Sequence, residues 1–195
     1  MRYWLFKSEP FKFSWSDLKK KGARGEEWDG VRNYQARNNM REMKLGDLGF
    51  FYHSNEGKEI VGICEVCALA HQDSTTDDER WQCVDIKALA DMPKPVTLAQ
   101  VKQTEVLARM PLVTAMRLSV QPVPVEHWKL VCKMGGLDLK DLKTGKTPPN
   151  KRVKTAKSKP KPATSKAPQK VAKKAVKKAK QTQASKKNRR ALAKG

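Results

Sequence analysis

Acidic residues are absent from about the last quarter of this 195-residue chain. From Lys146 to Gly195 the sequence holds 19 Lys and Arg residues and has no Asp, Glu, Cys, His or aromatic residue. Residues 1–145, by contrast, hold 22 basic and 20 acidic residues. A segment so charged and so poor in apolar side chains cannot bury enough surface to offset its chain entropy. We therefore expect a globular domain followed by a disordered basic tail.

Long apolar runs are also missing. No stretch approaches the ~20 residues that a membrane-spanning helix needs. The apolar part of the N-terminus is short and is followed at once by Lys7 and Glu9, unlike a signal peptide. We expect no membrane contact and a location where the chain is made. That is the cytoplasm, in association with the nucleoid, for a bacterial protein, and the nucleus for a eukaryotic one.

Cysteine is scarce, with four residues in the chain. Cys64 and Cys67 have the C-x-x-C spacing of zinc and redox sites. Their surroundings, IVGICEVCALA, indicate a strand, in which residues three apart point to opposite faces. No second such pair follows, so we interpret the cysteines as buried and reduced and predict no metal site.

Signatures of common enzymes are absent as well. The chain has no G-x-S-x-G, G-x-G-x-x-G or P-loop motif, and its three His residues are far apart in sequence. A base-directed enzyme needs a placed carboxylate or amine, for which Glu9 and Lys7 are candidates. Their simpler interpretation is an ion pair at a strand end. We predict no catalytic residue and no cofactor, and keep as an alternative an enzyme that uses Glu9 or His53 on a flipped nucleotide.

Short strands alternate with helices along residues 1–136. Ser14 with Asp17, and Thr97 with Gln100, have the spacing of helix capping boxes. The segment from Asp73 to Glu79 is expected to be an exposed acidic loop. These patterns predict an α+β domain built on a mixed, curved sheet or small barrel. The expected strands are 2–6, 48–54, 59–71, 81–89 and 117–123, and the expected helices are 14–22, 33–45, 97–103 and 124–134.

Residues 28–40, WDGVRNYQARNNM, combine flat aromatic rings with amide and guanidinium groups. Recognition of a nucleobase needs stacking surfaces and convergent donors and acceptors. Trp28, Tyr34 and Tyr52 offer the surfaces, and Asn33 offers an amide. Each has a simpler interpretation, since Trp28 could be core and Asn33 a helix cap. Their clustering favours a pocket for a planar, polar ligand such as a nucleobase.

Five segments together resemble the EVE domain family of the PUA-like superfamily. The resemblance covers residues 1–136 and leaves 137–195 outside. It implies a PUA-like mixed-strand pseudo-barrel with flanking helices, of the α+β class, followed by a disordered tail rich in Lys, Ala and Pro. The segments are YWLFKSEP (3–10), WDGVRNYQARNNMREMKLGD (28–47), FFYHSN (50–55), VGICEV (61–66) and RLSVQPV (117–123).

The same resemblance implies a reader of modified bases rather than an enzyme. Its ligand would be 5-methylcytosine or a related modified base, in DNA rather than RNA, and the oligomeric state is not readable. The family's pocket segments fall on Lys7, Ser8, Glu9, Trp28, Val31, Arg32, Asn33, Tyr34, Tyr52, His53, Ser54, Ser119, Val120 and Gln121.

The basic tail resembles the arms of linker histones in composition. Polycations bind nucleic acids with little sequence preference by releasing counterions. Two alternatives remain: a tail that only aids solubility, and an architectural DNA-condensing protein whose pocket is vestigial. We expect phosphate contacts from Arg37 and, in the tail, from Lys151, Arg152, Lys173, Lys174, Lys177, Lys178, Arg189 and Arg190.

Overall fold

A mixed sheet organises the residues that this computed structural model describes, which are residues 1–138 and residue 142. Its strands lie in the order β2-β5-β4-β3-β1-β6, so that β2 and β6 form open edges. Strands β1 and β3 run parallel, and the other neighbours are antiparallel. The strands are β1 (Tyr3–Ser8), β2 (Glu26–Glu27), β3 (Leu48–His53), β4 (Glu59–Gln72), β5 (Gln82–Thr97) and β6 (Val120–Pro122).

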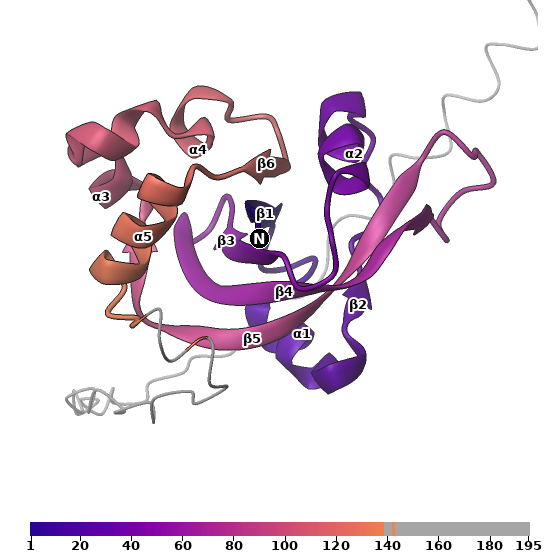
Figure 1. Cartoon of the computed structure of the whole chain (residues 1–195), viewed down its shortest axis with the longest axis horizontal. Coiled ribbons are helices and arrows are strands. Elements are labelled where there is room, and N and C mark those ends of the chain that lie inside the picture. The colour runs from indigo at the N-terminus through magenta and orange to yellow at the C-terminus, as the bar shows by residue number, and fades with distance from the viewer. Residues whose placement is uncertain (139–141, 143–195) are drawn as a thin grey trace, which may run out of the picture. The chain divides into compact units, whose positions relative to one another are not determined.

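Helices flank this sheet. In Figure 1, β4 and β5 are long and curved, with α3, α4 and α5 gathered at one end and α2 near the hairpin that β4 and β5 form at the other. The predicted α+β class with a mixed, curved sheet is confirmed. The helices are α1 (Trp15–Lys21), α2 (Tyr34–Arg41), α3 (Leu98–Gln103), α4 (Pro111–Thr114) and α5 (Val125–Met134), with 3-10 turns η1 (Gly22–Arg24) and η2 (Glu105–Arg109).

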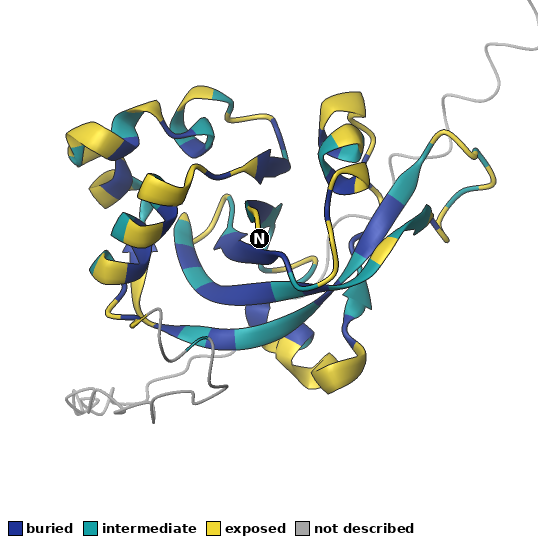
Figure 2. Ribbon diagram, in the orientation of Figure 1, coloured by how far each residue is buried: buried dark blue, intermediate teal, exposed yellow. Residues whose placement is uncertain are grey.

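The sheet separates two hydrophobic clusters, because successive strand residues point to opposite faces. Along β1, Trp4 and Phe6 belong to one cluster and Leu5 to the other. Helices α1 and α2 bury residues in the cluster of Trp4, whereas α3 and α5 bury theirs in the cluster of Leu5. Figure 2 shows the buried residues concentrated along the strands and on the sheet-facing sides of the helices.

Local sequence signals explain where several helices begin. Ser14 caps α1 and Thr97 caps α3, each in a capping box as predicted. The helix predicted for residues 33–45 is shorter, since α2 ends at Arg41. Met43 lies beyond this end but still reaches the core beside Met40, so its apolar spacing imitates a longer helix. The strand predicted for 81–89 is longer and runs to Thr97.

The basic tail, predicted for 137–195, falls almost wholly outside the described residues. Its boundary at 136 and the tail's phosphate contacts therefore stay predictions. Within the described part, no helix combines the length and the apolar character that crossing a membrane requires. The tail residues concerned are Lys151, Arg152, Lys173, Lys174, Lys177, Lys178, Arg189 and Arg190.

Candidate ligand-binding pocket

A cavity of about 740 Å³ opens where the parallel strands β1 and β3 both end. Backbone hydrogen bonds bring its walls together. The N–H of Ser54, just after β3, donates to the carbonyl of Ser8 at 2.8 Å, and the N–H of Lys7 donates to the carbonyl of Ser119 at 2.9 Å. Residues 26–32 close the other side, anchored by a bond from the N–H of Trp28 to the carbonyl of Val84 at 2.8 Å.

The pocket brings together many of the residues that the sequence singled out. Lys7, Ser8, Glu9, Trp28, Val31, Arg32, Ser54 and Ser119 line it. It also contains residues that sequence reasoning missed, although two of them, Asp29 and Gly30, lie within the segment 28–40. The missed lining residues are Lys12, Phe13, Glu26, Glu27, Asp29, Gly30, Asn55, Met116 and Arg117.

Trp28 and Phe13 provide the aromatic part of the lining, and packing against other rings holds Trp28 in place. Its ring meets the rings of Phe6 and Phe51 edge to face, with centroids 5.2 and 5.6 Å apart, and Phe13 lies 6.3 Å away. Trp28 is therefore both core and pocket, with 7% of its surface exposed. Edge-to-face packing fixes the ring's orientation, which suits a surface against which a planar ligand is placed.

Three predicted pocket residues are held away from the lining by the sheet. Tyr52 follows Phe51 in β3, so it points to the opposite face and packs in the cluster of Leu5. Val120 is fully buried opposite Phe6 on β1. The Gln121 amide is also buried and donates to three backbone carbonyls, so it serves the structure of the loop before β6.

Three more predicted residues lie outside the lining for local reasons. The side chain of Asn33 accepts the N–H of Ala36 at 3.0 Å, which makes it the cap of α2. Tyr34 lies on the exposed side of that helix and stacks on Trp81. His53 accepts the N–H of Trp15 at 3.0 Å through Nε2, and burial, opposed by the nearby Glu59, lowers its pKa. A neutral ring suits this acceptor role.

Lys7 is a partly buried basic residue of the pocket lining. Burial lowers the pKa of Lys7 to about 8. Its Nζ donates to the carbonyl of Met116 at 3.1 Å and lies 3.5 Å from that of Ala115. The ion pair between Lys7 and Glu9, considered from the sequence, does not form. Glu9 pairs instead with Lys12 at 2.7 Å and accepts a hydrogen bond from Asn55.

A buried carboxylate, Asp73, fixes the pocket wall. It accepts hydrogen bonds from the N–H of Gly30 at 3.0 Å and from Nη1 of Arg32 at 2.6 Å, and further bonds from Thr75. Burial alone would raise the pKa of Asp73, but these hydrogen bonds outweigh it and lower the pKa to about 2. The expectation of an exposed acidic loop from Asp73 to Glu79 is therefore wrong at Asp73, which is 1% exposed.

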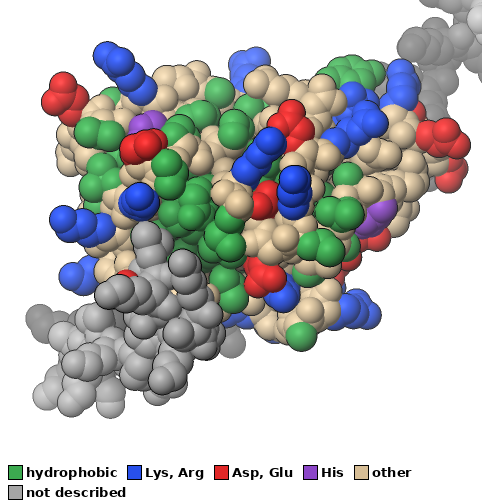
Figure 3. All heavy atoms as spheres, in the orientation of Figure 1, with side chains coloured by type: hydrophobic (Ala, Val, Ile, Leu, Met, Phe, Trp, Pro, Cys, Tyr) green, Lys and Arg blue, Asp and Glu red, His purple; other side chains and the backbone are tan. Residues whose placement is uncertain are grey.

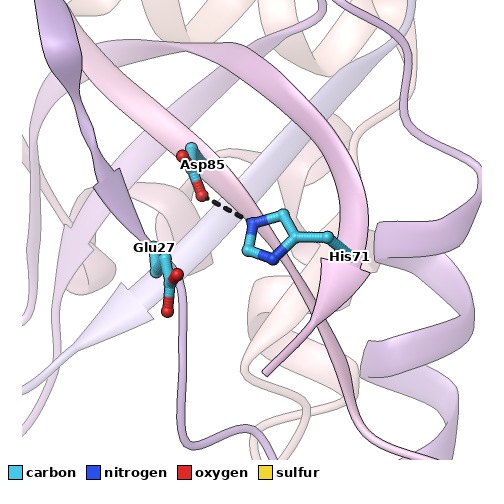
Figure 4. Close-up of side chains that lie close together, drawn as sticks. All are labelled: Glu27, His71 and Asp85. Atoms are coloured by element: carbon cyan, nitrogen blue, oxygen red, sulfur yellow. Dashed lines mark hydrogen bonds and ion pairs between the residues drawn. The ribbon is translucent and has the colours of Figure 1, made fainter. Parts of the chain in front are cut away.

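Beside the pocket, one histidine does approach two carboxylates, contrary to what sequence spacing indicated. Figure 4 shows Glu27, His71 and Asp85, from β2, β4 and β5, and one ligand atom of each lies within 4.8 Å of the others. His71 Nε2 is 2.9 Å from Asp85, and this hydrogen bond raises the pKa of His71. The hydrogen bond between His71 and Asp85 joins β4 to β5, with the Glu27 carboxylate of β2 nearby.

Among the described residues, the cysteines do not form a set of metal ligands. All four are free thiols, and Cys64, Cys83 and Cys132 are buried, as expected. Cys67 is only half-buried. Burial raises the pKa of Cys83 and Cys132 to about 12, so these thiols stay protonated at neutral pH.

The rim of the pocket carries both signs of charge. Arg32 and Arg117 line the pocket together with Glu26, Glu27 and Asp29, which form its acidic side. Burial raises the pKa of Asp29, and the neighbouring carboxylates Asp73, Glu27 and Glu26 raise it further. The pocket thus combines an aromatic surface, serine hydroxyls and charges of both signs. Such a lining suits a planar, polar ligand that has both donors and acceptors.

The fold and pocket define an α+β domain with a ligand cavity at the ends of two parallel strands. A sequence model described as the EVE domain matches residues 2–134. The chain belongs to the EVE domain family, as the resemblance indicated.

Relatives agree with this assignment. Thymocyte nuclear protein 1 of Mus musculus is 37% identical over 164 residues, covering 68% of this chain and 73% of that protein. A solved protein of Agrobacterium tumefaciens is 65% identical, with a TM-score of 0.70, covering 70% of this chain and 94% of that one. Human THYN1 protein, solved in complex with DNA containing 5-methylcytosine, is 34% identical with a TM-score of 0.66, covering 71% of this chain and 99% of that one.

The anchor of the pocket wall can be tested through its pH dependence. Asp73→Asn should lower the free energy of unfolding at pH 7 by about 1–3 kcal/mol, because it weakens a buried hydrogen-bond network. A carboxylate with a lowered folded pKa stabilises above its unfolded pKa and loses this effect as pH falls. The difference from wild type should therefore shrink between about pH 4 and pH 2.

Urea unfolding at several pH values measures this difference. Asp77→Asn is the matched control, since Asp77 is an exposed carboxylate of the same loop. An equal loss in both variants, or a loss that does not change with pH, would contradict the role of Asp73.

Proposed function

We propose that this chain is a non-enzymatic reader that holds a modified base of DNA, 5-methylcytosine or a related one, in the pocket between β1, β3 and residues 26–32. The observation that carries the proposal is the coincidence of this cavity with the family's pocket segments at Lys7, Trp28 and Ser119. The human relative solved with DNA containing 5-methylcytosine supports the choice of ligand.

The mechanism follows from base flipping. Extruding a base from its stack costs a few kcal/mol, which contacts in the pocket must offset. Trp28 and Val31 supply apolar surface, and stacking on an aromatic ring is worth about 1–3 kcal/mol. The hydroxyls of Ser54 and Ser119 have no hydrogen-bond partner within the described part of the chain, so they are free to read the polar edge of the base.

The interactions of the two candidate catalytic groups support binding rather than catalysis. Glu9 is engaged by Lys12 and Asn55, and His53 accepts the N–H of Trp15 at the start of α1. A general base must reach the proton that it abstracts, whereas both groups are already committed to neighbouring segments. These contacts favour binding over the alternative of an enzyme that uses Glu9 or His53.

The basic tail adds affinity without selectivity in this proposal. Its 19 Lys and Arg residues contact phosphates and raise the local concentration of bases near the pocket. The place of action is then wherever the modified DNA lies, in the nucleoid or in the nucleus. DNA is favoured over RNA by the human relative's ligand.

Two substitutions should separate methyl recognition from base recognition. In this proposal the methyl group of 5-methylcytosine lies against Val31, which lines the pocket. Val31→Ala removes this apolar surface, and burying one carbon is worth about 0.8 kcal/mol. The preference for 5-methylcytosine over cytosine should therefore fall about fourfold. Ser119→Ala should weaken binding to both bases equally. The measurement is titration of matched oligonucleotides that carry one cytosine, 5-methylcytosine or 5-hydroxymethylcytosine.

Ser16→Ala, on the exposed side of α1, is the control for loss of a hydroxyl. Trp28→Ala is less informative, because Trp28 packs in the core and its loss affects stability. An unchanged base preference in Val31→Ala would place the methyl elsewhere.

Binding should also depend on the charge of Lys7. With its pKa lowered to about 8, Lys7 is mostly charged at pH 7 and mostly neutral at pH 9. Affinity for DNA should therefore fall over this range as the cation is lost, and Lys7→Gln should bind more weakly at pH 7 and show a flatter profile. Titrations of both proteins from pH 6.5 to pH 9.5 measure the difference. An identical profile in the variant would exclude Lys7 from the contact.

Removing residues 146–195 tests whether the tail supplies general affinity for DNA while the pocket supplies selectivity for the modified base. The shortened chain should bind all DNA more weakly, with a flatter dependence of affinity on salt, because fewer counterions are released. Its ratio of affinities for modified and unmodified DNA should not change. A lost ratio would place recognition in the tail. The Agrobacterium relative consists largely of the part that remains, which supports its folding alone.

A further inference from the structure

A row of exposed and half-buried aromatic and basic side chains begins at the pocket wall. Tyr34 stacks on Trp81 with ring centroids 5.0 Å apart and planes 26° from parallel. The guanidinium of Arg32 lies 5.5 Å from the centre of the Trp81 ring, and that of Arg37 lies 5.0 Å from the centre of the Tyr34 ring. Tyr34 and Arg37 are neighbours on α2, whereas Trp81 directly precedes β5.

This aromatic pair contributes little to the core. Neither Tyr34 nor Trp81 belongs to the two hydrophobic clusters, and Tyr34 is 52% exposed. Arg32 lies over Trp81 and Arg37 lies over Tyr34, so a further planar group stacks on this pair by taking the place of the Arg37 guanidinium at Tyr34. Nucleobases are such groups, and every base can stack because each has a π-face.

The two arginines differ in how their charges are compensated. Arg32 is paired with the buried Asp73 at 2.6 Å. The guanidinium of Arg37 donates to the carbonyl of Arg80 at 2.8 Å and to the Asn38 amide oxygen at 2.7 Å, and it has no carboxylate partner within the described residues. Its charge is thus available to an external anion. Arginine beside an aromatic surface suits a phosphate next to a stacked base.

Arg32 connects this row to the pocket, because it lines the cavity and also lies over Trp81. Figure 3 shows Lys and Arg side chains gathered over α2 and beside the β4–β5 hairpin, in the upper right of the view. A strand whose base entered the pocket and that continued past Arg32 would meet Trp81 and Tyr34 next.

We propose that Tyr34 and Trp81, with Arg37 beside them, bind the nucleotide adjacent to the base in the pocket. Its base stacks on the aromatic pair, and Arg37 pairs with a phosphate of the same strand. The inference rests on the proposed function for the base in the pocket. It assigns the row a separate role, which is to hold the flanking nucleotide whatever its sequence.

The test combines a substitution in the protein with the removal of one base from the DNA. The full chain binds a single-stranded oligonucleotide with one 5-methylcytosine, and two versions that lack the base on its 5′ or its 3′ side. Wild type should lose about tenfold in affinity for one of these versions. Tyr34→Ala should bind the intact strand about tenfold more weakly and lose nothing further on that version. Tyr34→Phe, which keeps the ring, should behave as wild type.

Non-additive losses are the signature of a direct contact. Additive losses for both versions, or a Tyr34→Ala variant that binds as tightly as wild type, would overturn the stacking surface. For the phosphate contact, Arg37→Ala should reduce the salt slope of binding by about one. Arg109→Ala removes the same charge from η2, at the other end of the domain, and should leave the slope unchanged. Equal slopes in the two variants would overturn the role of Arg37.

The same titrations, repeated on strands with cytosine in place of 5-methylcytosine, separate this inference from the proposed function. A coupling to the flanking base without any preference for 5-methylcytosine over cytosine would overturn the pocket's ligand and support the stacking surface. A preference without the coupling would support the pocket and overturn the surface.

Discussion

One buried carboxylate determines how the pocket and the outer surface are arranged. Removing a carboxylate from water is unfavourable by several kcal/mol unless it is well partnered, and Asp73 gains partners from both its own loop and residues 30–32. Since these bonds hold the Arg32 guanidinium from one side, its position over Trp81 is fixed as well. The pocket wall and the aromatic row therefore share one anchor, and neither can shift without breaking the bonds of Asp73.

Local signals in the sequence were sufficient for features that depend on neighbours in the chain. The capping boxes at Ser14 and Thr97 formed as predicted because a cap needs only residues three positions apart. Asn33 shows the limit of such signals, since the same amide that suits a base edge also suits a cap, and the cap prevailed. Strand periodicity places Tyr52 opposite Phe51, but one strand alone does not reveal which face carries the pocket.

Contacts between segments that are distant in the chain cannot be predicted from local sequence signals. Asp73 meets Arg32, and Trp81 meets Tyr34, only because β4 and β5 pair as a long hairpin beside the loop that precedes α2. The register of that hairpin shifts at several irregular positions between Ile60 and His71. Each shift changes which side chains share a face. The sequence pattern alone thus indicates a solvated acidic loop, although its first residue, Asp73, is buried and bonded to the pocket wall.

The proposed function gives the acidic side of the pocket a role, because it divides binding among the pocket, the aromatic row and the tail. Under the proposed function, Glu27 and Asp29 repel any nucleic acid that approaches, whereas the charge of Glu26 is compensated by Lys21 at 2.6 Å. In the same proposal, the tail and Arg37 attract every strand to a similar extent, and a buried methyl adds only about 0.8 kcal/mol. Repulsion at the rim weakens strands that merely rest on the domain, whereas a flipped base gains contacts with Trp28 that offset it. If the proposed function holds, the acidic side lowers background binding and leaves the small energy of base recognition to decide which strands stay bound.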